Sequence, residues 1–367
     1  MSGAPAVEFR VGTRVVPCPG QVRGRLAEEL RSLGVRRAGV VADRGVSDAG
    51  VLDHVVGGAG DVELVACGLV DEDPGLAEAE SIAQRAITEQ VQAVVVVGGG
   101  SALCAGKAAA VRLRNPGPLQ SYAGRDRLPS LPAPSIAVPT TAGSGSEVSE
   151  ALVLHDPRFA AHVVIRGRGY APRVALLDGE LLATLPRRPM VLAALDALSH
   201  CYEALWARGA TSFTDALALA AAASVRRSLP GALAGEAEAR QALLEASAMA
   251  NLACGSSDLA VVHALSSATA VGLPHGYQNG VLLPQAVELN AAVVSVPAAA
   301  EMAHLADLYE AIGFVPRFAA EELGAEAVDA MVAVALESPL TANNRRPLGE
   351  ADLRRMVGAA ATSHNRS

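Results

Sequence analysis

The sequence predicts an N-terminal α/β domain built on a parallel sheet, followed by an all-α C-terminal domain. A chain of 367 residues with 51% hydrophobic residues is long enough for two domains. Short β-branched runs alternate with helical patterns up to about residue 180, and long Ala/Leu-rich helical patterns follow. We expect the domains to be residues 1–183 and 184–367, because Thr184, Pro186 and Pro189 interrupt the pattern there.

In the first domain, strand-like runs and helix-like segments follow one another in turn. The expected strands are Ala38–Ala42, Val62–Ala66, Val91–Val97, Ile136–Val138 and Val174–Leu177. The expected helices are Val22–Leu33, Gly75–Gln90 and Ala102–Leu113. Strand, helix and strand repeated in this way imply a parallel sheet that is covered by helices on both faces.

The second domain is expected to contain helices only. Its candidate helices are Pro189–Ala207, Ser212–Ser228, Glu236–Ala253, Leu259–Ala270, Ala298–Ala311 and Glu350–Ala361. The polar breaks between helical patterns fall at wide intervals in this half of the chain, which favours long helices over strands.

Composition and charge argue against several classes of function. The net charge is -8, so no basic field exists that would attract nucleic acid or an anionic membrane. The five cysteines are never spaced as CxxC, which argues against a disulfide framework and a thiolate zinc cluster. The N-terminus lacks a signal-peptide pattern, and no apolar stretch reaches the ~20 residues of a membrane span. We therefore expect a cytoplasmic protein with neither a nucleic-acid nor a membrane partner.

A glycine-rich turn follows a strand that is apolar on both faces. Val94–Val97 leads directly into Gly98–Ser101, and a helix that carries Lys107 comes next. Backbone amides and the positive end of the helix dipole meet at such a turn, which suits a pyrophosphate. The pattern is neither a P-loop nor a complete GxGxxG motif, so a tight turn without a ligand is the alternative interpretation.

Two further segments favour a dinucleotide site. Asp43 closes an earlier strand, where a carboxylate accepts hydrogen bonds from an adenine ribose and repels a 2′-phosphate, although Asp is also a common turn residue. The segment Pro139–Glu147 is rich in Gly, Ser and Thr, which would let a cofactor or substrate approach the main chain. A flexible loop is the alternative for that segment.

Four residues form a candidate metal site. Asp196 and His200 are four positions apart in a helical, otherwise apolar segment, so both point from one helix face. His263 lies in another helical run, and His275 follows it 12 residues later, beyond a turn. Three imidazoles and a carboxylate suit Fe(II), Zn(II), Co(II) or Ni(II), and ligand type alone leaves the choice open. Each histidine taken singly fits an ordinary core or surface residue, so the hypothesis depends on their combination.

Taken together, these segments resemble the iron-containing (group III) alcohol dehydrogenase family, with some features of its maleylacetate reductase branch. The resemblance covers nearly the whole chain. The motifs that carry it are Gly98–Lys107, Pro139–Val148, Asp196–His200, His263–Ser267 and Leu273–Gly276. It implies a Rossmann-like N-terminal domain and a helical metal-binding domain, in a dehydroquinate synthase-like architecture.

The resemblance also implies roles for individual residues. The metal ligands would be Asp196, His200, His263 and His275, and the ion would be Fe(II), with Zn(II) or another divalent ion as the alternative. The cofactor-binding residues would be Asp43, Gly98, Gly99, Gly100, Ser101, Thr140, Thr141, Ser144, Ser149 and His162. Asp43 would favour NAD(H) over NADP(H). The catalytic residues would be His200, His263 and Ser267.

Several positions depart from the family pattern. Cys104 stands where the glycine motif usually carries Asp, an Asp that maleylacetate reductases also lack. Ser267 stands where the family commonly has a second histidine, near the substrate and suspected of proton transfer. His162 stands where many relatives have Lys, and the stretch from His263 to His275 is shorter than usual. These changes bear on the substrate and the proton route more than on the metal.

The expected function is that of an NAD(H)-linked alcohol dehydrogenase or aldehyde or ketone reductase. In this chemistry the ion polarises the substrate oxygen while hydride passes between the substrate carbon and nicotinamide. The expected partners are a small alcohol or carbonyl substrate and further copies of the chain, in a homodimer or higher homo-oligomer. Three alternatives stay open: a maleylacetate reductase-like enzyme, a sugar-phosphate cyclase-like lyase, and a non-catalytic metal- and NAD-binding partner protein.

Overall fold

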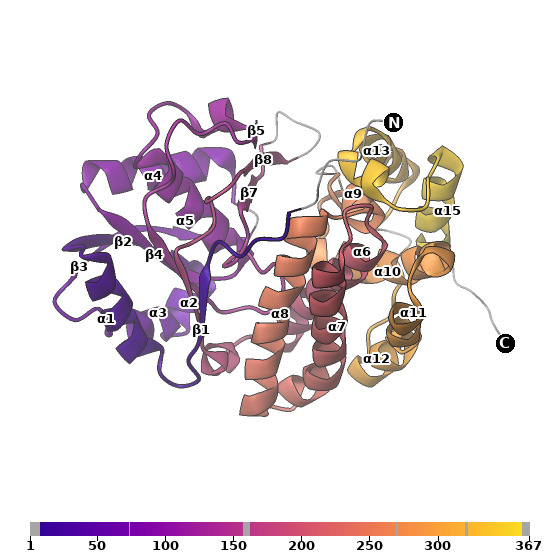
Figure 1. Ribbon diagram of the computed structural model, residues 1–367, viewed down its shortest axis with the longest axis horizontal. Coiled ribbons are helices and arrows are strands. Elements are labelled where there is room, and N and C mark those ends of the chain that lie inside the picture. The colour runs from indigo at the N-terminus through magenta and orange to yellow at the C-terminus, as the bar shows by residue number, and fades with distance from the viewer. Residues whose placement is uncertain (1–7, 73, 157–161, 269–270, 320–321, 362–367) are drawn as a thin grey trace.

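An α/β half and a helical half lie side by side in the protein (Figure 1). The structure, a computed structural model, describes residues 8–72, 74–156, 162–268, 271–319 and 322–361. No helix among these residues has the length and apolar character that crossing a bilayer requires.

Six strands form one sheet in which every neighbouring pair is parallel. The strands are β1 (Arg14–Pro17), β2 (Arg37–Asp43), β3 (Glu63–Val70), β4 (Ala93–Gly98), β6 (Ser135–Pro139) and β9 (Val174–Leu177). Their order across the sheet is β1-β9-β6-β4-β2-β3. All five expected strands are present, whereas the edge strand β1 was not expected. Its side chains are half-buried or exposed, so it lacks the continuous apolar run of a central strand.

Helices cover both faces of this sheet. The helices of this half are α1 (Val22–Leu33), α2 (Arg44–Asp48), α3 (Val51–Val56), α4 (Leu76–Thr88) and α5 (Gly100–Arg112), with short 3-10 helices at Leu119–Tyr122 and Gly179–Leu182. Alternate residues of β4 point to opposite faces of the sheet. Val95 and Val97 pack in a core with α1 and α3, whereas Val94 and Val96 pack in a core with α4 and α5. The predicted parallel sheet covered on both faces is confirmed.

A second, smaller sheet was not expected from the sequence. It consists of β5 (Gly124–Arg125), β7 (Ala151–Leu154) and β8 (Val163–Arg166), in the order β5-β8-β7. Leu152, Leu154 and Ile165 point to its buried face and share a core with α5 residues. Strands of two to four residues are too short to show a clear alternation, so their pattern alone could not identify them.

The C-terminal half contains only helices among its described residues, as predicted. They are α6 (Arg187–Trp206), α7 (Ser212–Leu233), α8 (Ala237–Ser257), α9 (Val261–Ser266), α10 (His275–Asn290), α11 (Val296–Met302), α12 (Leu305–Ile312), α13 (Ala325–Glu337), α14 (Pro339–Asn343) and α15 (Glu350–Ala361), with a 3-10 helix at Ala291–Val293. α8 lies nearest the large sheet in Figure 1, and Gln241 of α8 donates a hydrogen bond to the carbonyl of Leu177 at the end of β9.

Several features of the helical half differ from the prediction, and among them α13 and α14 were not expected. The prediction of a single helix over Ala298–Ala311 is wrong, because α11 ends at Met302 and α12 begins at Leu305, with Ala303 and His304 between them. The helix expected over Leu259–Ala270 is shorter, ending as α9 at Ser266, and residues 269–270 lie outside the described part of the chain. Helix α10 was not expected at all, since Pro284 interrupts its pattern, yet α10 carries one of the candidate ligands.

Candidate metal and cofactor site

The structure brings the four predicted metal-binding side chains together. The Nε2 atoms of His200, His263 and His275 lie 3.6, 3.5 and 3.7 Å from Oδ1 of Asp196. The candidate donor atoms of Asp196, His200 and His263 all lie within 4.8 Å of one another. Three helices supply these residues, with two from α6 and one each from α9 and α10.

Helix α10 reaches this cluster because glycines let it approach α6 closely. A Cβ at Gly276 would lie 2.2 Å from the carbonyl oxygen of Leu192, and one at Gly280 would lie 2.6 Å from Cδ1 of Leu195. The contact at Gly276 is with main chain, which leaves room only for glycine, whereas a side chain at Gly280 would displace the end of the Leu195 side chain. The close approach sets His275, the first residue of α10, beside Asp196.

The protonation states in the cluster suit a cation. Burial works against ionisation of Asp196, but the surrounding imidazoles, His200 foremost, hold the pKa of this carboxyl below its usual value. Burial also lowers the pKa of His200, which favours the neutral ring that can ligate a metal. Burial alone would lower the pKa of His263, but the neighbouring carboxylates of Glu203 and Asp196 raise it to about 9, and a bound cation would favour the deprotonated ring. One ionised carboxylate with three imidazoles is the donor set of a borderline divalent ion, so the residues present fit Fe(II) or a similar ion.

A second carboxylate, which the sequence analysis did not identify, supports His263 from behind. Glu203 is completely buried, and its Oε1 accepts hydrogen bonds from the main-chain amides of Val262 (2.6 Å) and His263 (3.4 Å). Its Oε2 makes a very short hydrogen bond with Nδ1 of His263. The carboxylate thereby places the imidazole proton on Nδ1 and leaves the Nε2 lone pair for a metal ion. The sequence feature that could have identified Glu203 is a charged residue three positions after His200 in an otherwise apolar helix.

The glycine turn joins the end of β4 to the start of α5. The amide of Gly99 donates to Oδ2 of Asp43 over 2.5 Å, so this carboxylate lies directly at the turn. Burial raises the pKa of Asp43, and the bond from Gly99 partly offsets that effect. A Cβ at Gly99 would lie 3.0 Å from Oγ1 of Thr141, and one at Gly100 would lie 2.9 Å from Oγ of Ser144. The glycines therefore allow the loop after β6 to pack against the turn.

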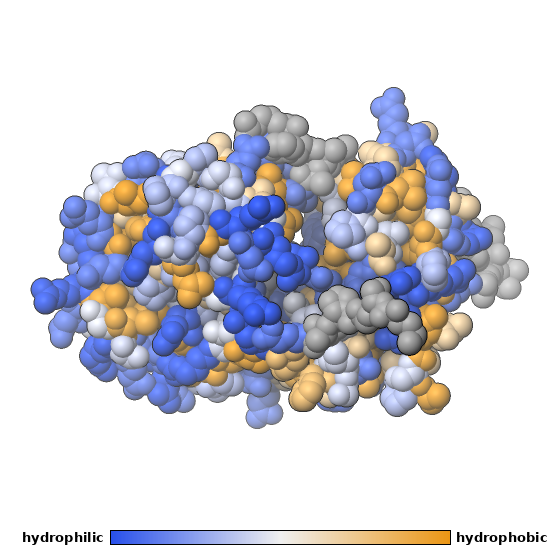
Figure 2. Space-filling model, turned by 45° about the horizontal axis from the view of Figure 1, so that its top comes forward, coloured by the Kyte–Doolittle hydropathy of each residue, from blue (hydrophilic) through white to orange (hydrophobic). Residues whose placement is uncertain are grey.

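That same loop connects the glycine turn with the metal cluster. A Cβ at Gly143 would lie 2.8 Å from main-chain atoms of Ala193 in α6, and the main chain of Gly143 lies beside the His200 ring. Gly145 adopts the left-handed conformation (φ 60°), and Asn251 of α8 donates to the carbonyl of Ser144 over 2.8 Å. Within a few residues, therefore, the loop contacts both the glycine turn and the metal cluster. The surface in Figure 2 is hollowed where the two halves meet.

Lys107 holds this loop in place and does not point toward the turn. Its ammonium group is almost fully buried and donates to the main-chain carbonyls of Ser146 (3.0 Å), Ser149 (3.4 Å) and Ala151. Three carbonyl acceptors satisfy its three N–H donors, so no donor is left for a phosphate. The sequence alone did not indicate this role, because the three acceptors lie far along the chain.

The remaining predicted residues lie around these elements. Thr140 is buried next to Thr141, and Ser149 accepts a hydrogen bond from the amide of Ala151 over 3.2 Å. His162 lies edge-on to His155, with 5.9 Å between ring centroids. The hydroxyl of Ser267 donates to the carbonyl of His263, one turn back, so its hydrogen is engaged with the main chain.

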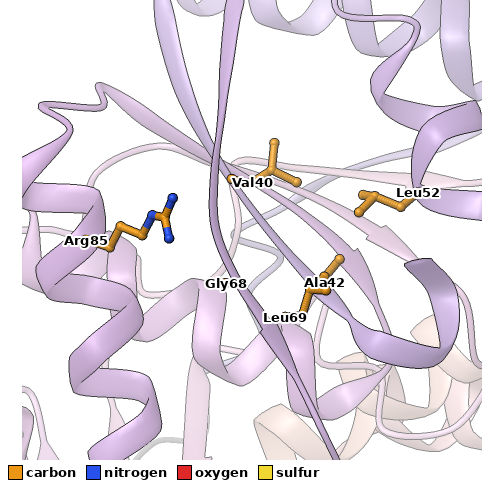
Figure 3. A pocket seen from close by; sticks show the side chains of 7 residues that line it. Val40, Ala42, Leu52, Gly68, Leu69 and Arg85 are labelled. Carbon is orange, nitrogen blue, oxygen red and sulfur yellow. The ribbon is translucent and has the colours of Figure 1, made fainter. Parts of the chain in front are cut away.

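A separate small hollow lies at the β2–β3 edge of the large sheet, away from this cluster. Figure 3 shows the guanidinium of Arg85 on one side of β3 and Leu52 on the other. Its lining residues are Val40, Ala42, Leu52, Ala66, Gly68, Leu69 and Arg85. It shares no residue with the metal cluster or the glycine turn.

Comparison with known proteins agrees with this geometry. Residues 14–179 match the family described as iron-containing alcohol dehydrogenase, and residues 190–361 match the C-terminal domain of the same family. The chain is 30% identical to the NAD-dependent methanol dehydrogenase of Bacillus methanolicus, over 79% of this chain and 78% of that protein. It is 37% identical to EutG of Escherichia coli, a probable alcohol dehydrogenase, but that alignment spans 54% of this chain and only about half (51%) of EutG.

A solved structure gives the same result in three dimensions. The iron-containing alcohol dehydrogenase of Thermococcus thioreducens superposes with a TM-score of 0.86 and 28% identity, covering 96% of this chain and 99% of that one. The two halves and their order along the chain are thus shared with that structure. The chain belongs to the iron-containing alcohol dehydrogenase family.

Proposed function

We propose that the protein is an NAD(H)-linked, metal-dependent alcohol dehydrogenase that interconverts small alcohols with aldehydes or ketones. One observation carries the proposal. The loop that packs on the glycine turn at Gly99 also lies against His200, within a cluster of one carboxylate and three imidazoles. A dinucleotide at the turn and an ion at the cluster would share one cleft, which is what hydride transfer to a polarised carbonyl requires.

Asp196, His200, His263 and His275 would hold the ion, and Fe(II) is the ion we propose from the family to which the chain belongs. When bound, the ion would polarise the substrate oxygen and the nicotinamide would exchange hydride with the substrate carbon. Because two α6 ligands are nearly fully buried, few waters can reach the cluster from that side. Burial of this kind strengthens the charge interactions of the bound state.

The cofactor would bind across the glycine turn. Gly98, Gly99, Gly100 and Ser101 would face the pyrophosphate at the start of α5, a helix of 13 residues with a full dipole. We propose that Asp43 then selects NAD(H) over NADP(H), because a ribose 2′-hydroxyl can donate to its carboxylate while a 2′-phosphate is repelled. Thr140, Thr141, Ser144, Ser149 and His162 complete the proposed cofactor set.

For the proton, we propose a route through Ser267 and water. The Ser267 hydroxyl hydrogen is engaged with the carbonyl of His263, so its oxygen can accept a hydrogen bond from the water that carries the proton. Three further proposals follow from the sequence and the family. We propose that the chain consists of two domains, residues 1–183 and 184–367. We also propose that the protein is cytoplasmic and that it assembles as a homodimer or larger homo-oligomer. The location is supported by five free cysteines.

An anaerobic reconstitution tests the proposal. The apoprotein is loaded with Fe(II), and NADH oxidation is followed with panels of aldehydes, ketones and keto acids. We expect turnover with at least one class, and its loss in His200→Ala with NADH binding retained. His304→Ala is the matched control, because His304 is a half-exposed histidine paired with Asp307 and lies on α12's N-terminus. Stoichiometric binding of metal and NADH without turnover on any panel would contradict the proposal.

A further inference from the structure

An amide side chain occupies the centre of one face of the metal cluster. Nδ2 of Asn279 lies 2.8 Å from Oδ1 of Asp196, 3.1 Å from Nε2 of His275 and 3.2 Å from Nε2 of His263. Asn279 is completely buried, and it follows His275 by one turn on α10. It therefore contacts three of the four candidate ligand atoms at once, although it was not identified from the sequence.

The orientation of this amide is determined by its neighbours. If the amide were reversed, its oxygen would lie against a carboxylate oxygen of Asp196, and that contact would be repulsive whichever tautomers the imidazoles adopt. In the observed orientation the two N–H groups face acceptors, while Oδ1 of Asn279 accepts no hydrogen bond within the described part of the chain. The side chain thus directs its donors, rather than its oxygen, at the cluster.

The acceptor atoms would otherwise repel one another. Glu203 holds a His263 proton at Nδ1, so in the neutral ring that can bind a metal ion Nε2 presents a lone pair toward the carboxylate of Asp196. Partial positive charge on the Asn279 amide offsets this repulsion, as a bound cation would. An amide has two N–H groups and faces three acceptors here, so it cannot satisfy all three at the same time. One contact is always weak, and a cation can displace it.

We infer that Asn279 is a positioning residue of the metal centre. It keeps Asp196, His263 and His275 at the spacing of a bound ion before the ion arrives, and it retains only the bond to Asp196 afterwards. This inference rests on the proposed metal site. It assigns Asn279 no ligand bond and no contact with substrate, so its effect is on ion affinity rather than on the reaction itself.

Titration of the full-length apoprotein with Co(II), followed by its visible absorption and by calorimetry, tests the inference. We expect Asn279→Ala to weaken Co(II) binding on the order of 10–100-fold, the usual effect of losing a residue that orients ligands. NADH binding should be unchanged. Asn290→Ala is the matched control, because Asn290 is also a fully buried asparagine on α10, and its side chain hydrogen-bonds to Ala286 and Asn344 instead of to the cluster.

Asn279→Asp provides a second, nearly isosteric variant should the alanine variant fold poorly. It places a carboxylate against Asp196, so we expect a lower melting temperature without metal at pH 8 and a larger gain on adding Co(II) than in the wild type. Co(II) affinity of Asn279→Ala equal to that of the control, or an unchanged metal-dependent gain in Asn279→Asp, overturns the inference. If the wild type itself bound no Co(II), the proposed function would fail instead, so the two failures are distinguishable.

Discussion

Replacing Glu203 by Gln should weaken metal binding without changing the shape of the side chain. Glu203 is completely buried and acts only as an acceptor, toward the amide of Val262 with one oxygen and toward Nδ1 of His263 with the other. A glutamine has one acceptor and one donor end. Whichever way it is placed, its NH2 group faces either the Val262 amide or the Nδ1–H of His263, and both are donors.

The imidazole can relieve this conflict by moving its proton to Nε2. That tautomer removes the lone pair that faces Asp196, and a metal ion must then displace a proton in order to bind. Losing a hydrogen bond to a charged group costs about 1.5–3 kcal/mol. Since about 1.4 kcal/mol is a factor of ten, the cost predicts metal binding weaker by roughly 10–100-fold.

Calorimetric titration of the apoprotein with Co(II) measures this directly, and steady-state kinetics with saturating metal complete the test. We expect weaker metal affinity, with kcat largely recovered at high metal concentration and NADH affinity unchanged. Glu245→Gln is the control, because Glu245 accepts from Gln241 on α8 and lies outside the cluster. Wild-type metal affinity in Glu203→Gln would refute the argument that a carboxylate sets the His263 tautomer.

Four further outcomes are expected. Gly276→Ala should lower the free energy of unfolding by about 1–3 kcal/mol and weaken Co(II) binding, because the new Cβ would lie 2.2 Å from the carbonyl oxygen of Leu192. Thermal melts measure the loss of stability, and metal titration measures the loss of affinity. Burial raises the pKa of Glu147 from 4.5 to about 7, so wild-type stability should fall as pH rises between those values, by at most about 3 kcal/mol; urea unfolding of Glu147→Gln should show a flatter pH dependence. Lys107→Met should raise KM for NADH while leaving Co(II) affinity intact, because the loop that packs on the glycine turn loses its anchor; a rise in metal Kd of equal size would contradict this. Asp43→Ala should shift the NADPH-to-NADH ratio of kcat/KM toward NADPH on the order of tenfold, equivalent to about 1.4 kcal/mol, and an unchanged ratio would place cofactor selection elsewhere.

The sequence by itself determined most of the elements and the nature of the site. The run Val174–Leu177 coincides with a strand, and Val22–Leu33 and Glu350–Ala361 coincide with helices, because apolar periodicity is a local property that the chain displays directly. The spacing of Asp196 and His200 predicted a shared helix face for the same reason. These features need no knowledge of what packs against them.

Only the tertiary structure decided which distant groups meet. His275 reaches Asp196 because α10 packs closely on α6, and the sequence around Gly276 does not show which helix this glycine packs against. The roles of Glu203, Asn279 and Lys107 depend on partners that, apart from His275 beside Asn279, lie 16 to 83 residues away along the chain, so no local pattern could show them. The physical reason is that hydrogen bonds and ligand geometry act over a few ångströms in space, whereas sequence periodicity reports only on neighbours along one element.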